Sequence, residues 1–439
     1  MPHGSEAASR SSETGPRRSR FSPLEYRDPA PAPWLIHALG TLNRLAILPW
    51  LLKLRRFDLP AADRARLAAA VNPGTVAFLG PNHPEFLTDW MVDKELSRRL
   101  SPLMAHWASY EIVNASPLAR SFWLANNLIA NVPAGGGKAY SVAWALRGHG
   151  VLLHPEGTAT WQAGRVAPLL PGIVDMARDA AARLRSARDG RPVWLVPVVW
   201  RMVFLGDARR GLARDLGVIE RGVGLASGRR LPVPERFATL MRRLLALQCE
   251  RLGLGVPAPG PDVDYFAAQA SAMAALARDL ATRYGTGDPD LTRTQFQLRK
   301  AMRERAATDP EGVRRDRARL AELQRLASLD PALYDRPELE QERIAEVLKR
   351  TRSSLLTRGL AHSLHNMFPI AAGPRVVHVR AAEPIPVAAP SVTTASEDEA
   401  RLGLLAELRS RLQATLDRLA AELEPDVAGH RLSNPLHRG

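Results

Sequence analysis

A histidine and an aspartate lie close together in the segment GPNHPEFLTDW, residues 80–90. His83 stands between Asn82 and Pro84, and Asp89 follows six positions after the histidine. A carboxylate that bonds one ring nitrogen of a histidine fixes the tautomer and leaves the other nitrogen free as a general base. We therefore interpret His83 as a catalytic base and Asp89 as the residue that orients it.

The neighbouring sequence places this pair at the edge of a sheet. The apolar run TVAFLG, residues 75–80, predicts a buried strand that ends just before His83. Pro84 suits the first turn of a helix, so we expect a helix to begin there and Asp89 to lie two turns into it. The carboxyl edge of a sheet is where α/β proteins bind their ligands. This position supports a functional role for His83.

A second motif, HPEGTATWQAGRVAPLLPGIVDMA, covers residues 154–177 and begins 71 residues after His83. It follows another apolar run, and similar runs recur along the chain between helical patterns. We predict strands at 75–80, 102–108, 127–132, 150–155, 193–200 and 375–380, and helices at 138–147 and 172–186. Such alternation indicates an α/β layer fold.

The N-terminal part divides into two segments. Residues 1–32 read as a disordered basic tail without an apolar core for a signal peptide, so export is not expected. The most apolar stretch of the chain runs from Trp34 to Phe57 within a helical segment at 33–70. Burying Arg44 in a bilayer would cost roughly 2.5–3.5 kcal/mol, which disfavours a spanning helix. We predict an amphipathic helix that lies in the membrane surface, or else an ordinary helix packed on the domain.

The remaining chain contains a sheet-forming core interrupted by a helical block. We assign the core to 71–204, a large all-helical insertion rich in Arg, Ala and Leu to 205–370, a return strand and C-terminal helix to 371–424, and a tail to 425–439. Strand patterns are absent from the helical block.

Composition limits the partners and the chemistry. The 439 residues carry 60 Lys and Arg against 45 Asp and Glu, a net charge of +15 that favours an anionic partner. The Arg-rich helices lack interleaved aromatic residues, so nucleic acid is not the expected partner. Cys249 is the single cysteine, which excludes an internal disulfide and fits a reducing compartment. No histidine pair has the spacing of a zinc site on a helix, so we expect no metal.

Together, the motifs NH…D and PEGT resemble those of the glycerolipid acyltransferase family, the enzymes that acylate lysophosphatidic acid and related acceptors. The similarity extends to PLLPG (168–172), VPVVW (196–200) and HVRAAEPIPV (378–387). It covers residues 71–204 and 371–424, whereas the helical block has no counterpart in the family. The resemblance implies a mixed, mostly parallel sheet flanked by helices.

It also implies an activity and a set of substrates. His83 would remove the proton of an acceptor hydroxyl as that hydroxyl attacks an acyl thioester, and Glu156 with the Gly157 backbone would hold the polar head of the acceptor. Asn82 and Thr158 complete the substrate-binding set of these two motifs. The donor would be acyl-CoA or acyl-carrier protein, the acceptor a lysolipid or a glycerol-phosphate-type molecule, and no cofactor is required. The protein would work as a peripheral or monotopic protein on the cytoplasmic side of an anionic membrane.

The spacing of the first motif departs from the family pattern. Five residues separate His83 from Asp89, where the family has four, and the usual aspartate position holds Thr88. One extra residue on an ideal helix turns the carboxylate by about 100°. Either the turn before the helix is wide, or Asp93 or Glu85 replaces Asp89 as the partner of the histidine.

The cationic positions also differ. Three basic residues of the family motifs are missing from this chain. The corresponding positions fall near Val132 and Pro133, at Ala159, and at Leu170 or Pro171. We propose that a glycine-rich helix start, Gly135, Gly136, Gly137 and Lys138, binds a phosphate instead, with Arg165 as a second candidate. Otherwise the acceptor carries less charge. His154 occupies the position of a family phenylalanine, either as a polar group behind the site or as a histidine satisfied at a strand end.

These departures leave a second hypothesis open. A family member with an altered motif and fewer cations can be catalytically silent and serve as a scaffold for membranes or proteins through its helical block. The alternatives differ in whether substitution of His83 abolishes transfer of an acyl group.

Overall fold

A computed structural model describes residues 21–437 except 86–87, 227–229, 256–262, 287–290, 307, 357–369 and 389–393. Within the described residues, eight strands form one sheet. They are β1 Leu54–Asp58, β2 Val76–Pro81, β3 Ala105–Ser109, β4 Leu128–Asn131, β5 Val151–Leu152, β6 Val193–Phe204, β8 Arg375–Ala381 and β9 Ile385–Pro386. The sheet order is β1-β8-β6-β2-β5-β3-β4, with β9 beside β6.

Most strand pairs are parallel. Only β6 with β8 and β6 with β9 run antiparallel among the pairs of this sheet that the structure describes. The prediction of an α/β fold with a mixed, mostly parallel sheet flanked by helices is therefore confirmed. The predicted strand at 150–155 is shorter than expected, because pairing with β2 and β3 ends at Leu152.

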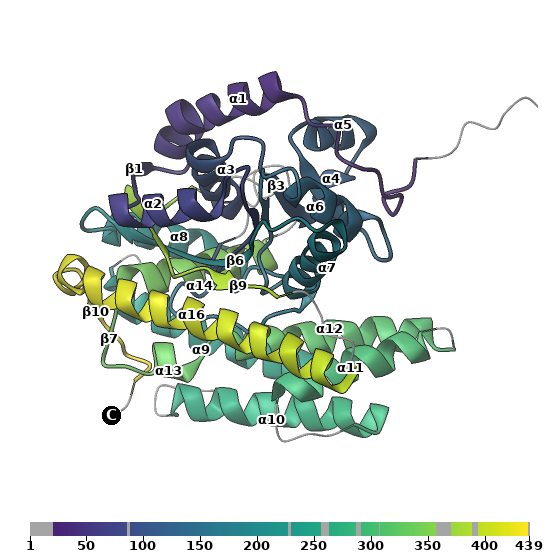
Figure 1. Cartoon of the computed structure of the whole chain (residues 1–439). Helices are drawn as coiled ribbons and strands as arrows, with labels where there is room; N and C mark the ends of the chain where they lie inside the picture. The colour runs from purple at the N-terminus through teal and green to yellow at the C-terminus, as the bar shows by residue number, and fades with distance from the viewer. Residues whose placement is uncertain are drawn as a thin grey trace, which may run out of the picture.

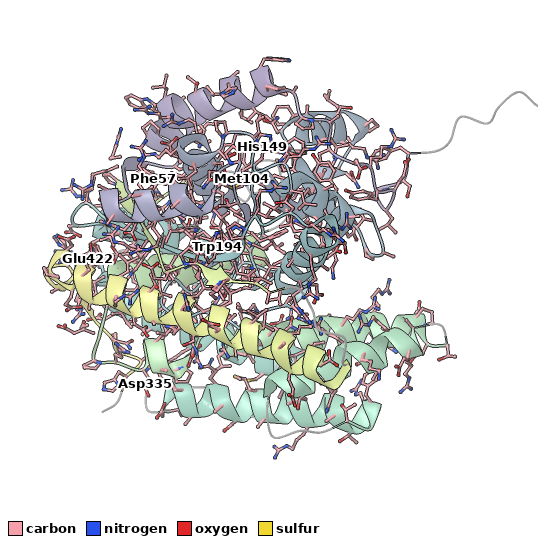
Figure 2. The ribbon with its side chains drawn as sticks, viewed as in Figure 1. Phe57, Met104, His149, Trp194, Asp335 and Glu422 are labelled. Carbon is pink, nitrogen blue, oxygen red and sulfur yellow. The ribbon has the colours of Figure 1, made fainter. Side chains whose placement is uncertain are left out.

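Alternating side chains build a core on each face of the sheet. Val76 and Phe78 of β2 lie in one apolar cluster, and Ala77 and Leu79 lie in another on the opposite face. The first face is covered by α6 Gly137–Ala145, α7 Gly172–Ala187 and α16 Thr394–Ala428, and the second by α2 Ala61–Ala70 and α3 Thr88–Leu100. Figure 1 shows α16 crossing the first face. Glu422, labelled in Figure 2, ties this helix to the sheet through a 3.0 Å hydrogen bond from Arg380 of β8.

The order of the strands creates a crevice. The chain leaves β2 through α3 and reaches β3 on one side, whereas it leaves β5 through α7 and reaches β6 on the other side. Because β2 and β5 are parallel neighbours, their carboxyl ends meet where the connections diverge. Such a switch point is where open α/β sheets form ligand sites.

The N-terminal segment differs from the prediction of one helix through Phe57. It forms α1 Pro33–Leu42 and a π-helix, η1 Asn43–Leu51, and then a strand, β1, that pairs in parallel with β8. Pro49 lies within η1, where its missing N–H interrupts regular α-helical bonding. Among the described residues, no helix combines the length and apolar character needed to cross a bilayer.

The block after β6 is helical, with one small exception. Its helices are α8 Arg209–Gly222, α9 Val233–Leu252, α10 Tyr265–Tyr284, α11 Leu291–Arg305, α12 Pro310–Ala327, α13 Pro331–Tyr334 and α14 Gln341–Leu355. In Figure 1, α9 to α13 lie below the sheet, beyond α16. A two-residue strand, β7 Glu338–Leu339, pairs with β10 Leu432–Ser433 near the C-terminus. In the segment assigned to a tail, 425–439, α16 continues to Ala428, and Leu432 and Leu436 are buried in the core of the helical block.

Helix α14 joins this block to the sheet. The carboxylate of Glu342 accepts a 2.7 Å hydrogen bond from the Phe204 backbone at the end of β6, and Gln341 accepts one of 2.6 Å from Ala208. These acceptors are buried. The helical block therefore packs directly on the core, close to the strand ends that form the crevice.

Candidate active site

A cavity of about 670 Å³ opens at the carboxyl ends of β2, β5, β3 and β4. Its lining combines His83, Asp89, Asp93, His106 and His154 with apolar and aromatic side chains from α3, from the segment after β3, and from α5 Pro117–Ala125. The apolar part includes Trp90, Trp107, Ile112, Trp123, Leu128 and Leu153. A largely apolar cavity that also contains a few titratable side chains is typical of a small-molecule site.

The structure brings His83 and Asp89 together. The His83 ring hydrogen-bonds an Asp89 carboxylate oxygen through Nδ1, and the other carboxylate oxygen accepts a 3.0 Å bond from the Glu85 backbone. Helix α3 begins at Thr88 and not at Pro84, so Asp89 lies in its first turn. Residues 82–84 have no regular secondary structure, and Asp89 reaches His83 although five residues separate the two in the chain. Asp89, not Asp93 or Glu85, is therefore the partner of His83.

A second histidine–aspartate pair lies beside the first. His154 Nε2 is 2.8 Å from an Asp93 carboxylate oxygen, and His154 Nδ1 is 2.9 Å from the backbone oxygen of Asn82. The rings of His83 and His154 stack with their centroids 4.2 Å apart and their planes at 15°. Asp89 and Asp93 stand one helical turn apart on α3, so one helix face holds both imidazoles. The sequence indicated only the first pair, although the spacing of Asp89 and Asp93 was a signal for the second.

Burial and neighbouring charges set the protonation of this cluster. Burial, together with His154, holds the pKa of His83 well below its usual value. Burial, Asp93 and Glu85 raise the pKa of Asp89, so the proton between Asp89 and Nδ1 belongs to the pair as a unit. Within the described residues, no hydrogen bond occupies Nε2 of His83. This nitrogen is therefore available to accept a proton from a ligand in the cavity.

Glu156 braces the loops and does not face the cavity. One carboxylate oxygen accepts a 2.7 Å bond from the His83 backbone, and the other accepts a 2.7 Å bond from Ala167. Asn82 is also structural, because its side chain bonds both backbone groups of Trp200 at 2.9 and 3.1 Å. Glu156 and Asn82 thus hold the backbone that presents His83, and their assignment as substrate-binding residues stays a prediction.

Two other predicted substrate-binding residues do line the cavity. Gly157 and Thr158 follow β5 and face the side of the cavity where His83 and His154 lie. Gly157 has a positive φ of 73°, and a Cβ there would come 2.4 Å from Leu170. The turn therefore needs glycine at this position.

The structure does not support the predicted phosphate site. Lys138 is exposed and pairs with Asp175 at 3.1 Å, and it is not among the residues that line the cavity. Gly136 and Gly137 give room for the rings of Tyr26 and Trp107, which would meet a Cβ at 2.9 and 3.0 Å. Their small size therefore serves packing.

Arg165, the second phosphate candidate, is also engaged elsewhere. Its guanidinium forms an ion pair with Asp330 at a separate groove, which is formed with α16 and with the chain around α13. A cation that already has a carboxylate partner is a weaker ligand for an anion.

Buried ion pairs anchor the loop that carries His83. The Glu85 carboxylate receives hydrogen bonds from Lys349 of α14, at 2.9 and 3.0 Å, and from Arg375 of β8, at 2.8 Å. Burial would raise the pKa of Glu85, but Arg375 and Lys349 outweigh it and lower the pKa to about 2. Sequence reasoning missed this role, because nothing near Glu85 in the chain indicates partners at positions 349 and 375.

The donor atoms of His83, Asp89 and His154 lie within 4.8 Å of one another, which raises the question of a metal ion. The two rings are nearly parallel, so the lone pairs of their nitrogens lie in two separate planes and do not converge on one point. Both nitrogens of His154 also have hydrogen-bond partners already. This geometry suits proton transfer better than coordination of one shared ion.

Comparison of the chain with protein-family models and with curated proteins finds no match.

We predict that loss of the Glu85 carboxylate strongly lowers the stability of the fold. Glu85→Gln leaves Lys349 and Arg375 buried without a carboxylate, and we expect the free energy of unfolding to fall by about 3–5 kcal/mol. Glu383→Gln is the matched control, because Glu383 pairs with Arg66 but is 70% exposed, and exposed pairs contribute about 0–1 kcal/mol. Urea denaturation measures both. Equal losses in the two variants would contradict a role for Glu85 as anchor.

Glu156 predicts a pH dependence of stability. Burial raises its pKa to about 7 in the folded protein, from an ordinary value of 4.5. The folded state then binds the proton of Glu156 more tightly than the unfolded state does. Protonated Glu156 therefore contributes to the free energy of unfolding below about pH 4.5, and this contribution is lost as the pH rises through about 7. The free energy of unfolding of Glu156→Gln should lack this decline. Parallel curves for wild type and variant between these pH values would show that Glu156 is not its source.

Proposed function

We propose that the chain is an O-acyltransferase that moves a fatty acyl group from acyl-CoA or acyl-carrier protein to a hydroxyl of a glycerolipid acceptor. The observation that carries this proposal is the His83–Asp89 pair, whose second ring nitrogen has no hydrogen-bond partner among the described residues, in the lining of a largely apolar cavity. The motif resemblance adds the reaction class, which the geometry alone leaves open.

The chemistry requires only groups of the chain and two substrates. As the acceptor oxygen forms its bond to the thioester carbonyl carbon, its proton passes to Nε2 of His83. Asp89 stabilises the resulting imidazolium through Nδ1. The C–S bond then breaks, and the departing thiolate takes the proton back from His83. No covalent bond to the protein forms, so the buried Cys249 has no part in the reaction.

The cavity walls match the apolar substrate. Trp90 and Trp123 contact each other edge to face, with ring centroids 5.0 Å apart, and both line the cavity with Leu128 and Ile112. Its volume falls within the range of about 300–1,000 Å³ that ligand sites occupy. We place the acyl chain against these rings and the thioester beside His83.

The engaged cations favour an acceptor of low net charge. Lys138 and Arg165, the groups expected to bind a phosphate, pair with Asp175 and Asp330. A zwitterionic lysolipid or another hydroxyl-bearing lipid needs fewer free cations than a phosphomonoester. We therefore rank these acceptors above lysophosphatidic acid and glycerol 3-phosphate.

An exposed apolar face supports association with a membrane. Trp34 and Leu42 of α1, and Leu45 and Trp50 of η1, are between 51% and 73% exposed. Helix α5 lies next to α1 in Figure 1 and exposes Leu118, while its Trp123 reaches the cavity. We propose that this face lies in the surface of an anionic membrane, on its cytoplasmic side, and that lipid substrates enter the cavity from there.

The scaffold hypothesis keeps one supporting observation, the lack of free cations at the predicted phosphate site. The spacing of the motif no longer favours it, because Asp89 bonds His83 despite the extra residue. The two hypotheses separate on activity.

Replacing the base tests the enzyme directly. Purified wild type should transfer labelled acyl groups from acyl-CoA to at least one acceptor in a panel of lysolipids, and His83→Ala should lower the rate by about 10²- to 10⁴-fold. His430→Ala is the control and should retain full activity, because His430 follows the end of α16 and is not in the cavity lining. No transfer by wild type with any donor or acceptor, together with intact liposome binding, favours the scaffold.

The membrane face makes a separate prediction. Burying a large apolar side chain contributes roughly 1.5–3 kcal/mol, so Trp34→Ser combined with Trp50→Ser should weaken binding to anionic phospholipid vesicles at least about tenfold. Vesicle flotation measures the bound fraction. Leu402→Ser on α16 is a suitable control, since Leu402 is 61% exposed and lies outside this face. Equal binding by the double variant and the control would exclude α1 and η1 as the contact.

A further inference from the structure

His154 is held on both sides of its ring. Nδ1 faces the backbone oxygen of Asn82 at 2.9 Å, and Nε2 faces the Asp93 carboxylate at 2.8 Å. A carbonyl oxygen only accepts hydrogen bonds, so Nδ1 must carry a proton. An ionised Asp93 likewise requires a proton on Nε2. The ring satisfies both partners as an imidazolium.

The electrostatics of the pair agree with this assignment. Burial lowers the pKa of His154, but the Asp93 carboxylate and the Asn82 carbonyl outweigh it and raise the pKa. The Asp93 side chain is 3% exposed and that of His154 is 11% exposed, so solvent screens the pair weakly. The surroundings of His154 therefore favour its protonated form.

This cation lies directly on the His83 ring. The two centroids are 4.2 Å apart and the planes are nearly parallel. A second positive charge on His83 would therefore stand face to face with the first, in a buried environment. Because Asp93 and Asn82 fix His154, the stacked His83 ring has a fixed plane as well.

We propose that His154, held by Asp93 and the Asn82 carbonyl, is a positioning residue that fixes the plane of the His83 ring and, as a stacked cation, keeps His83 unprotonated. Its consequence for catalysis rests on the proposed function, because only an unprotonated Nε2 can accept the acceptor proton. The protonation state of His83 itself is a property of the folded chain and can be measured without substrate.

Other charged groups around His83 act in both directions. Negative groups on α3 and the neighbouring loops favour its protonated form, whereas His154 and the cations that neutralise Glu85 oppose it. Asp89 of α3 bonds the His83 ring, Glu156 after β5 accepts from the His83 backbone, and His154 stacks on the ring. One contact further away, Asp93 of α3 bonds His154, and Lys349 of α14 and Arg375 of β8 bond Glu85 of the loop after β2. His154 is the cation in contact with the ring, so its removal should dominate.

The test is a titration of the His83 ring by NMR in wild type and His154→Phe, with His83→Ala to assign the signal. Phenylalanine keeps an aromatic ring against His83 but removes the charge and leaves Asp93 unpaired. The midpoint for His83 should lie below 6.5 in wild type and rise by roughly one pH unit or more in the variant. Equal midpoints would overturn the proposal.

A double variant guards against misfolding. His154→Phe with Asp93→Asn removes the unpaired buried carboxylate, so it should fold even if the single variant does not. The midpoint for His83 should still rise, but by less, because the contacting cation and a more distant anion leave together. A midpoint at or below the wild-type value would again reject the proposal.

The pH dependence of acyl transfer provides a test that is independent of the NMR titration. If wild type transfers acyl groups, the acid limb of kcat/KM should move to higher pH in His154→Phe by the same shift as the NMR midpoint. A lower kcat with an unmoved acid limb would assign His154 a packing role only and refute the proposal. If wild type transfers nothing, the proposed function fails, and the NMR shift still decides the role of His154.

Discussion

The candidate site depends on the bonds that hold the short irregular segment between β2 and α3. Asn82 bonds β6, the His83 backbone donates to Glu156, and Glu85 receives Lys349 and Arg375. These partners come from four separate parts of the chain. Their combined effect is to hold His83 at the cavity while Asp89 approaches from the first turn of α3. A looser segment would let the imidazole and the carboxylate separate, because the one local bond, from the Glu85 backbone to Asp89, holds the carboxylate and not the imidazole.

Several carboxylates gather in this small buried volume, and each has a different partner. Glu85 is neutralised by two cations, Asp89 shares a proton with His83, Asp93 faces His154, and Glu156 accepts two backbone bonds. Low dielectric makes an unpaired charge costly, so each partner determines the protonation of its acid. Carboxylates of the same residue type therefore differ in protonation because their partners differ. That is a physical basis for keeping one imidazole neutral beside another that is charged.

The helical block contributes to the site although it lies outside the sheet. Helix α14 provides Lys349 to Glu85, and its Glu346 accepts a 3.2 Å bond from Ala163 in the segment that follows Thr158. The segments that follow β2 and β5, which both carry cavity-lining residues, therefore contact the same helix. We infer that the block supports the site mechanically. Of the elements in the proposed membrane face, α5 reaches the cavity lining through Trp123.

The sequence alone determined the features that depend on local patterns. Apolar runs and helical periodicity predicted the strands and helices of an α/β fold, and the short separation of His83 and Asp89 limited the pair to one region. Only the tertiary structure placed β1 beside β8, moved the start of α3 to Thr88, and gave Asn82 and Glu156 bracing roles. It also paired Lys138 and Arg165 with carboxylates and stacked His154 on His83. The physical reason is that periodicity is a property of neighbouring residues, whereas a buried polar group takes its partner from whichever distant segment packs against it.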